Sequence, residues 1–162
     1  EIGSNTYTGG ASPLLGHTLE RVFDALGLER AEYLKHLSHS LALSVDGSQA
    51  YDPNFSDRFE PRHNPSMGEG VTIKFDARSS YSTTAAAYAY IQQVAKKKNI
   101  KLNTFVNKGD QRSGSTLGPI VATNLGVPAL DLGVSQLSMH STREIASLRD
   151  YADLVKLLGS IF

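Results

Sequence analysis

Apolar positions along the chain recur with two different periods. A helical spacing predicts helices over residues 12–27, 29–38, 82–98, 116–125 and 151–161. Shorter apolar or alternating runs predict strands over residues 41–45, 71–75, 102–106 and 129–132. Because strands and helices alternate along the chain, the pattern is that of a layered α/β domain.

One long segment, residues 49–70, interrupts this alternation. It shows neither period, and prolines and glycines recur along it, at Pro53, Pro61, Pro65, Gly68 and Gly70. A loop of this length inside a compact domain is usually functional or covers a neighbouring surface. Aromatic and charged side chains within it indicate packing rather than disorder; they are Tyr51, Phe55, Arg58, Phe59 and His63.

Candidate chemistry is concentrated between Gly109 and Glu144. SGSTLGP, from Ser113, is a glycine-bounded, hydroxyl-rich loop that leads into a predicted helix, and VPALDLG, from Val127, is typical of a buried strand. SMHSTRE then places His140 just beyond that strand. Since α/β proteins bind ligands at the carboxyl ends of strands, this order predicts a functional site here.

Composition narrows the class of protein. The 162 residues suit one domain with a substantial core, and 40% hydrophobic residues are ordinary for a globular protein. Equal numbers of basic and acidic side chains, 16 of each, argue against nucleic acid as the main partner. No apolar run approaches the roughly 20 residues of a membrane span. The chain begins at Glu1 rather than at Met, which leaves open whether a segment precedes it.

Residues beside predicted strand ends are candidate metal ligands: Glu1, Asp46 and His140. The chain has no cysteine, and two carboxylates with an imidazole suit zinc, manganese or cobalt. For Asp46 the spacing alone favours a different role, a cap on the turn at Gly47. The remaining histidines of the predicted helices are interpreted as ordinary surface residues; they are His17, His36 and His39.

Several segments occur in the same order as in one known family. They are EIGS at Glu1, SVDGSQAYDPNF at Ser44, VTIKF at Val71, SYST at Ser80 and SGSTLGPIVATNLGVPALDLGVSQLSMHSTRE at Ser113. Together they resemble the carboxyl-terminal part of the aspartyl aminopeptidase family, which includes vacuolar aminopeptidase I and consists of dinuclear zinc exopeptidases. QLSMHSTRE after GPIVATNLG carries most of the specificity. The resemblance implies that residues 1–162 form the carboxyl-terminal part of a catalytic domain, a three-layer αβα sandwich with a mixed sheet.

The resemblance also implies a ligand set for two metal ions. The family has adjacent glutamates before IGS, a general base followed by a metal ligand, and Glu1 matches the second. Asp46 matches a ligand of one ion and His140 a ligand of the other. The implied cofactor is a pair of divalent ions, with zinc ahead of cobalt and manganese. Because another histidine and the bridging aspartate lie upstream in the family, residues 1–162 alone are expected to be inactive.

Further matches imply contacts with the substrate. Lys74 matches a pocket lysine that meets an acidic substrate side chain, although strand alternation alone would usually direct such a lysine to solvent. Tyr81 matches an active-site tyrosine, and Gly114 and Ser115 match the loop beside the substrate. The chain departs from the family at positions that bear on acidic specificity: Gln49 and Asp52 replace histidines, and Ser80 replaces an arginine.

The expected function is that of a metalloaminopeptidase, in which metal-activated water removes N-terminal residues, acidic ones among them, from peptides. A homo-oligomer in the cytoplasm or a vacuole is expected. One alternative is a catalytically silent relative that acts as an assembly or peptide-binding module and binds no stoichiometric zinc. A nucleotide-binding domain is a weaker alternative, because the SGSTLG loop lacks the P-loop lysine and the GxGxxG spacing.

Overall fold

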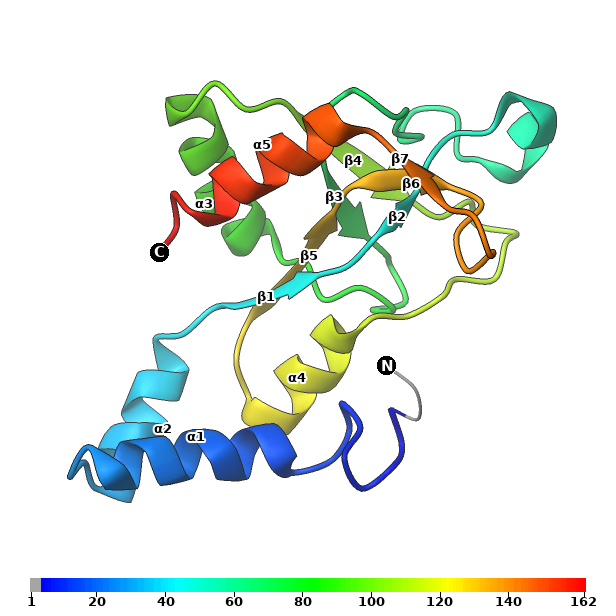
Figure 1. Ribbon diagram of the computed structural model, residues 1–162. Helices are drawn as coiled ribbons and strands as arrows, with labels where there is room; N and C mark the ends of the chain where they lie inside the picture. The colour runs from blue at the N-terminus through cyan, green and yellow to red at the C-terminus, as the bar shows by residue number, and fades with distance from the viewer. Residues whose placement is uncertain (1–3) are drawn as a thin grey trace.

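The apolar and alternating runs form two β-sheets with helices around them in the computed structural model, which describes residues 4–162 (Figure 1). The main sheet has the strand order β1 (Ala42–Val45), β5 (Ala129–Gly133), β3 (Val71–Phe75) and β4 (Leu102–Val106). β1 is parallel to β5 and β3 to β4, whereas β3 is antiparallel to β5. The sheet is therefore mixed, as expected.

A second, smaller sheet continues the first. Its strands are β2 (Ser48–Gln49), β6 (Ser135–Leu137) and β7 (Ile145–Ala146). The parallel pair of β2 and β6 continues the register of the parallel pair of β1 and β5. The ladder breaks at Gly133, where a Cβ atom would lie 1.8 Å from the Asp46 carbonyl oxygen. The sequence patterns did not predict these short strands, because too few residues carry their alternation.

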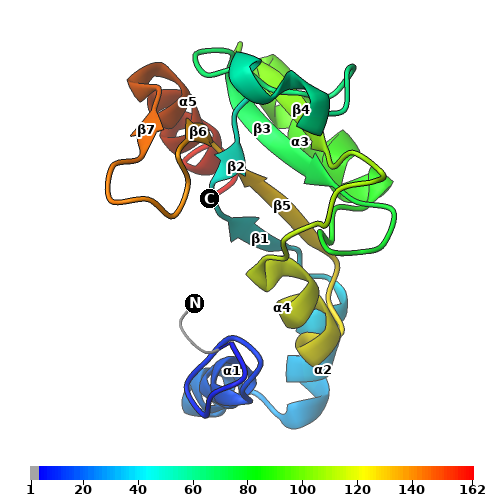
Figure 2. The ribbon, with the colours of Figure 1, turned by 90° about the vertical axis from the view of Figure 1, so that its right-hand side faces the viewer.

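Helices enclose the main sheet from both sides. They are α1 (Leu14–Ala25), α2 (Arg30–Ser38), α3 (Ala85–Lys97), α4 (Leu117–Leu125) and α5 (Leu148–Leu158), with a 3-10 helix η1 (Pro53–Arg58) in the long loop. Figure 1 shows α3 and α5 on one side of the sheet and α4 on the other. The turned view in Figure 2 shows the second sheet beside α5, and the α1–α2 hairpin beneath α4. No helix within residues 4–162 is long and apolar enough to cross a membrane.

The predicted elements are present with shifted boundaries, and the largest shift is in α5. The sequence pattern predicted a helix over residues 151–161, whereas α5 begins at Leu148 and ends at Leu158. Its start is set by Ser147, whose hydroxyl accepts a hydrogen bond from the Asp150 backbone N–H at 3.4 Å. Capping thus decides the boundary where apolar spacing does not.

The two faces of the main sheet differ in polarity. Ile73, Leu130 and Leu132 have no exposed surface and belong to the apolar core with α3 and α5. The polar residues Thr72, Lys74 and Asp131 occupy alternate positions of the same strands and are also buried. Because Ile73 pairs with Leu132, the neighbouring Lys74 and Asp131 share the opposite face. That face, covered in part by α4, therefore holds buried polar side chains.

Asp150 fastens the long loop to α5. Its carboxylate is fully buried and accepts hydrogen bonds from the backbone N–H groups of Gly68, at 2.6 Å, and Gly70, at 2.8 Å. Gly70 has φ +102°, and a Cβ atom there would lie 2.2 Å from the Lys101 carbonyl oxygen. The end of the loop is therefore fixed by backbone contacts as β3 begins.

We predict that Asp150→Ala lowers the free energy of unfolding by roughly 3 kcal/mol, because the buried N–H group of Gly70 and the partly buried N–H group of Gly68 lose their acceptor. Urea denaturation, followed by circular dichroism, measures the change. Asp153→Ala on the same helix controls for removal of a carboxylate and for helix propensity. Equal losses in the two variants would show that the contacts to Gly68 and Gly70 contribute nothing.

Candidate active site

One cavity of about 560 Å³ brings together all the predicted site residues that the structure describes. Asp46 directly follows β1, Lys74 lies in β3, and Tyr81 lies between β3 and α3. The remaining predicted site residues come from the β4–α4 connection and from the turn after β6; they are Gly114, Ser115 and His140. Glu1 lies outside the described residues, so its position relative to the cavity stays a prediction.

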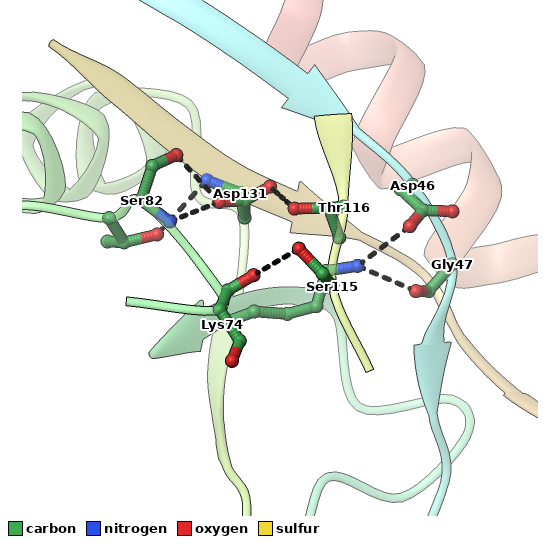
Figure 3. Close-up of polar contacts among 9 residues, drawn as sticks. Asp46, Gly47, Lys74, Ser82, Ser115, Thr116 and Asp131 are labelled. Carbon is green, nitrogen blue, oxygen red and sulfur yellow. Dashed lines mark hydrogen bonds and ion pairs between the residues drawn. The ribbon is translucent and has the colours of Figure 1, made fainter. Parts of the chain in front are cut away.

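Lys74 is buried in the cavity wall, with 2% of its surface exposed. Its Nζ donates to the Gly47 carbonyl oxygen at 2.8 Å and to Asp46 Oδ2 at 3.3 Å (Figure 3). The ammonium also lies 5.3 Å from the centroid of the Tyr81 ring. The expectation from strand alternation alone, that Lys74 points to solvent, is wrong, because the face opposite Ile73 is enclosed as well.

Asp46 faces the cavity from the end of β1. Its side chain is 48% exposed, and its carboxylate accepts a hydrogen bond from Lys74, whose ammonium also donates to the Gly47 carbonyl oxygen. The position therefore differs from the turn cap that spacing favoured. A half-exposed carboxylate beside a cavity remains accessible to a cation or a substrate amine.

His140 lies in a tight turn that projects into the solvent side of the cavity. His140 and Ser138 both have left-handed backbone conformations, with φ +66° and +57°. The turn is held by Glu144, whose Oε1 accepts a hydrogen bond from the His140 backbone N–H at 2.6 Å. Such conformations cost non-glycine residues about 1–3 kcal/mol each, and they concentrate at functional sites. His140 is exposed and lines the cavity.

Tyr81 is held between a cation and an aromatic ring. The Lys74 ammonium lies over its ring, and the Phe105 ring contacts it edge-on with centroids 6.2 Å apart. Burial raises the pKa of the Tyr81 phenol above its ordinary value of 10, and the negative charges of Asp76, Asp131 and Asp46 raise that pKa further. The phenol therefore stays protonated at neutral pH and can donate a hydrogen bond.

Asp131 is buried beneath the residues that line the cavity, and the sequence analysis did not identify it as a candidate site residue. Its carboxylate accepts hydrogen bonds from Ser82 and Thr116, which adjoin Tyr81 and Ser115 along the chain (Figure 3). The sequence patterns treated VPALDLG only as a buried strand. The available signal was an aspartate within a buried apolar run, because a carboxylate is rarely buried unless it is paired.

The described residues do not by themselves form a complete metal site. Within residues 4–162, no group of at least three His, Cys, Asp or Glu side chains is close enough to hold an ion. Asp46 and His140 share the cavity, whereas a catalytic zinc site usually has about three protein ligands. The α1–α2 region contains the histidines interpreted as surface residues, and none of them lines the cavity; they are His17, His36 and His39.

Known proteins match the chain along its full length. The family model described as aminopeptidase I zinc metalloprotease (M18) matches residues 1–162. A probable M18 family aminopeptidase 2 of Borreliella burgdorferi is 35% identical over 162 residues, which are 100% of this chain and 38% of that protein. The chain thus spans less than half the length of this curated relative.

Solved structures share both the fold and the sequence. The cryo-EM structure of the Ape4 and Nbr1 complex matches with a TM-score of 0.95 and 35% identity, covering 99% of this chain and 30% of the other. The S. cerevisiae mApe1 dodecamer matches with a TM-score of 0.84 and 28% identity, covering 99% of this chain and 35% of the other. The chain therefore belongs to the aminopeptidase I zinc metalloprotease family, M18.

Proposed function

We propose that the protein containing this chain is a dinuclear zinc aminopeptidase, and that the cavity forms part of its substrate site. The observation that carries the proposal is the meeting of Asp46, Lys74, Tyr81 and His140 around one cavity in a chain of the M18 family. These side chains come from segments far apart in the sequence, and each has the chemistry that peptide-bond hydrolysis at a metal centre requires.

The donor chemistry of the site fits zinc. A carboxylate and an imidazole are common zinc ligands, and Asp46 and His140 present both types at the cavity. Asp46 would hold one ion, and His140 with Glu1 would hold the other. When bound, a pair of divalent ions polarises a carbonyl group and activates water for attack. The adjacent upstream glutamate of the family would act as the general base.

The chain's own residues would bind and orient the peptide. Tyr81, whose phenol is protonated at neutral pH, would donate a hydrogen bond to the oxygen that becomes negatively charged during hydrolysis. Gly114 and Ser115 are exposed and would border the peptide backbone. Lys74 would attract an acidic N-terminal side chain, supported by Arg58 and Arg112, which also line the cavity.

We also infer that the protein is a homo-oligomer. The similar structure of mApe1 is a dodecamer, and the match covers 99% of this chain. Peptides are the substrates that an aminopeptidase of this family would take.

For the metal site, we predict that His140→Gln in the natural-length protein removes bound zinc and lowers kcat. The loss should exceed the roughly 10–100-fold that is typical when a residue hydrogen-bonded to a metal ligand is removed, because here the ligand itself is lost. Elemental analysis of the purified protein, with a peptide-hydrolysis assay, measures both effects. His36→Gln makes the same chemical change on α2, outside the cavity, and is expected to keep zinc and activity. Full zinc content in His140→Gln would contradict the assignment.

For substrate choice, we predict that Lys74→Met lowers kcat/KM for substrates with an acidic N-terminal residue by about 10–100-fold more than for neutral ones, because the enclosed positive charge is lost. Matched glutamyl and leucyl substrates give the comparison. Lys101→Met, at an exposed lysine outside the cavity wall, is the control. Equal losses on both substrates would exclude a role for Lys74 in specificity.

For the phenol, we predict that Tyr81→Phe lowers kcat by about 10²–10³-fold with little change in KM, because a donor to the transition state is removed. A spectrophotometric pH titration of the wild type, minus the same titration of Tyr81→Phe, isolates the ionisation of the Tyr81 phenol. Its midpoint should lie above pH 10, since the folded-state pKa is raised. The neutral phenol is thus kept below that midpoint and lost above it. Tyr90→Phe, at an exposed tyrosine of α3, is the matched control, and an unchanged kcat in Tyr81→Phe would contradict the assignment.

A further inference from the structure

Asp131 lies in the middle of β5 with no exposed surface, and every residue of that strand is buried. Burying a carboxylate costs free energy that an apolar residue at the same position would not. If residue 131 served only to form the strand, valine or leucine would be sufficient. The contacts of Asp131 therefore indicate what the carboxylate does.

The carboxylate binds two different segments of the cavity wall. Oδ2 accepts hydrogen bonds from the Ser82 backbone N–H at 2.6 Å and from the Ser82 hydroxyl at 2.8 Å, and Oδ1 accepts one from the Thr116 hydroxyl at 2.5 Å. The Asp131 backbone N–H donates to the Thr83 hydroxyl at 3.0 Å. One buried side chain thus joins the β3–α3 connection to the β4–α4 connection.

Each of these segments carries a predicted site residue next to the residue that Asp131 binds. Tyr81 precedes Ser82, and Ser115 precedes Thr116. The segments meet a second time nearer the cavity, where the Ser115 hydroxyl donates to the Ser80 carbonyl oxygen at 3.3 Å (Figure 3). Two sets of contacts therefore set the spacing between the Tyr81 phenol and the Gly114–Ser115 loop. They are the buried hydrogen bonds of Asp131 and the exposed hydrogen bond between Ser115 and Ser80.

The start of α4 is packed tightly against the same carboxylate. A Cβ atom on Gly118 would lie 2.5 Å from both oxygens of Asp131 and 2.4 Å from the Ser82 hydroxyl oxygen. The first turn of a helix favours a negative charge beside it. Glycine at this position lets the helix approach the carboxylate closely, and a larger residue there would displace Asp131 or Ser82.

We propose that Asp131 is a positioning residue of the active site, which holds the Tyr81 segment and the Gly114–Ser115 segment at the separation that the substrate requires. In its effect on hydrolysis the inference rests on the proposed function. Asp131 itself touches neither substrate nor metal in this assignment and acts through Ser82 and Thr116.

Asp150 provides a matched comparison within the same chain. It is also fully buried, and its carboxylate accepts hydrogen bonds from the backbone N–H groups of Gly68 and Gly70, which do not line the cavity. A variant at Asp150 removes a buried carboxylate and lowers stability without altering the wall. A loss of kcat that is specific to Asp131→Ala, together with faster exchange in the segments that Asp131 binds, therefore reports positioning.

The test compares Asp131→Ala, Asp131→Asn and Asp150→Ala in the natural-length protein, with kcat and KM corrected for the folded fraction. We expect Asp131→Ala to lower kcat by about 10–100-fold, the range seen when support for a functional group is lost, with a much smaller change in KM. Asp131→Asn should recover part of kcat, because its amide oxygen can still accept from Ser82 and the Thr116 hydroxyl can reverse to accept from its amide N–H. Asp150→Ala should leave kcat within about twofold of the wild type, because its contacts lie outside the wall.

Hydrogen–deuterium exchange supplies a readout that does not depend on activity. Asp131→Ala should speed exchange in residues 78–83 and 112–118, whereas Asp150→Ala should speed it in residues 66–71. Thr116→Val removes a single donor with little change in shape, and should speed exchange in residues 112–118 even if Asp131→Ala does not fold.

The outcomes separate the two proposals. A wild-type protein without aminopeptidase activity would overturn the proposed function, and the exchange pattern would then decide the positioning role. In an active enzyme, equal kcat in Asp131→Ala and Asp150→Ala would overturn that role, as would unchanged exchange in both wall segments of the Asp131 and Thr116 variants.

Discussion

The central strands β3 and β5 are buried on both faces, and this constraint governs the rest of the structure. Side chains alternate along a strand, so the apolar residues that pack against α3 and α5 force their neighbours to the other face. There the chain places Thr72, Lys74 and Asp131, all buried. A buried polar group is costly unless it is hydrogen-bonded, so every one of these side chains requires a partner from outside its own strand.

The partners come from the loops, and supplying them shapes the cavity. Thr72 bonds Ser135 of β6 at 2.8 Å, which fastens the second sheet to the first. Lys74 takes its acceptors from Asp46 and Gly47, at the break between β1 and β2. Asp131 takes its donors from the two connections that reach α3 and α4. The polar residues of the sheet thus act as anchors for the loops, and the side chains that face the cavity are held by the loops in turn.

Sequence patterns predicted the main strands and helices because each carries a full period of apolar residues. They missed β2, β6 and β7, where two or three residues are too few to show alternation. The mixed sheet and the αβα arrangement came from the family resemblance, since no local pattern distinguishes parallel from antiparallel pairing. For the site, the resemblance selected Asp46, Lys74, Tyr81 and His140, and the structure places them at one cavity. Asp131 escaped notice because its role arises from three-dimensional contacts with Ser82 and Thr116, which lie 49 and 15 residues away in sequence.

The charges around the cavity bear on which peptides it favours. The chain has Gln49, Asp52 and Ser80 where the resembled family carries basic residues, which reduces the positive charge available to an acidic side chain. Arg58 and Arg112 line the same cavity, but both are exposed, so solvent and salt weaken their attraction. Lys74 is buried, and charges interact more strongly where water is excluded. Its partner Asp46 is also the metal ligand of the proposed function, so in that proposal the same carboxylate would serve both Lys74 and an ion. If the proposed function holds, acidic selectivity and metal loading are expected to be coupled through this ion pair.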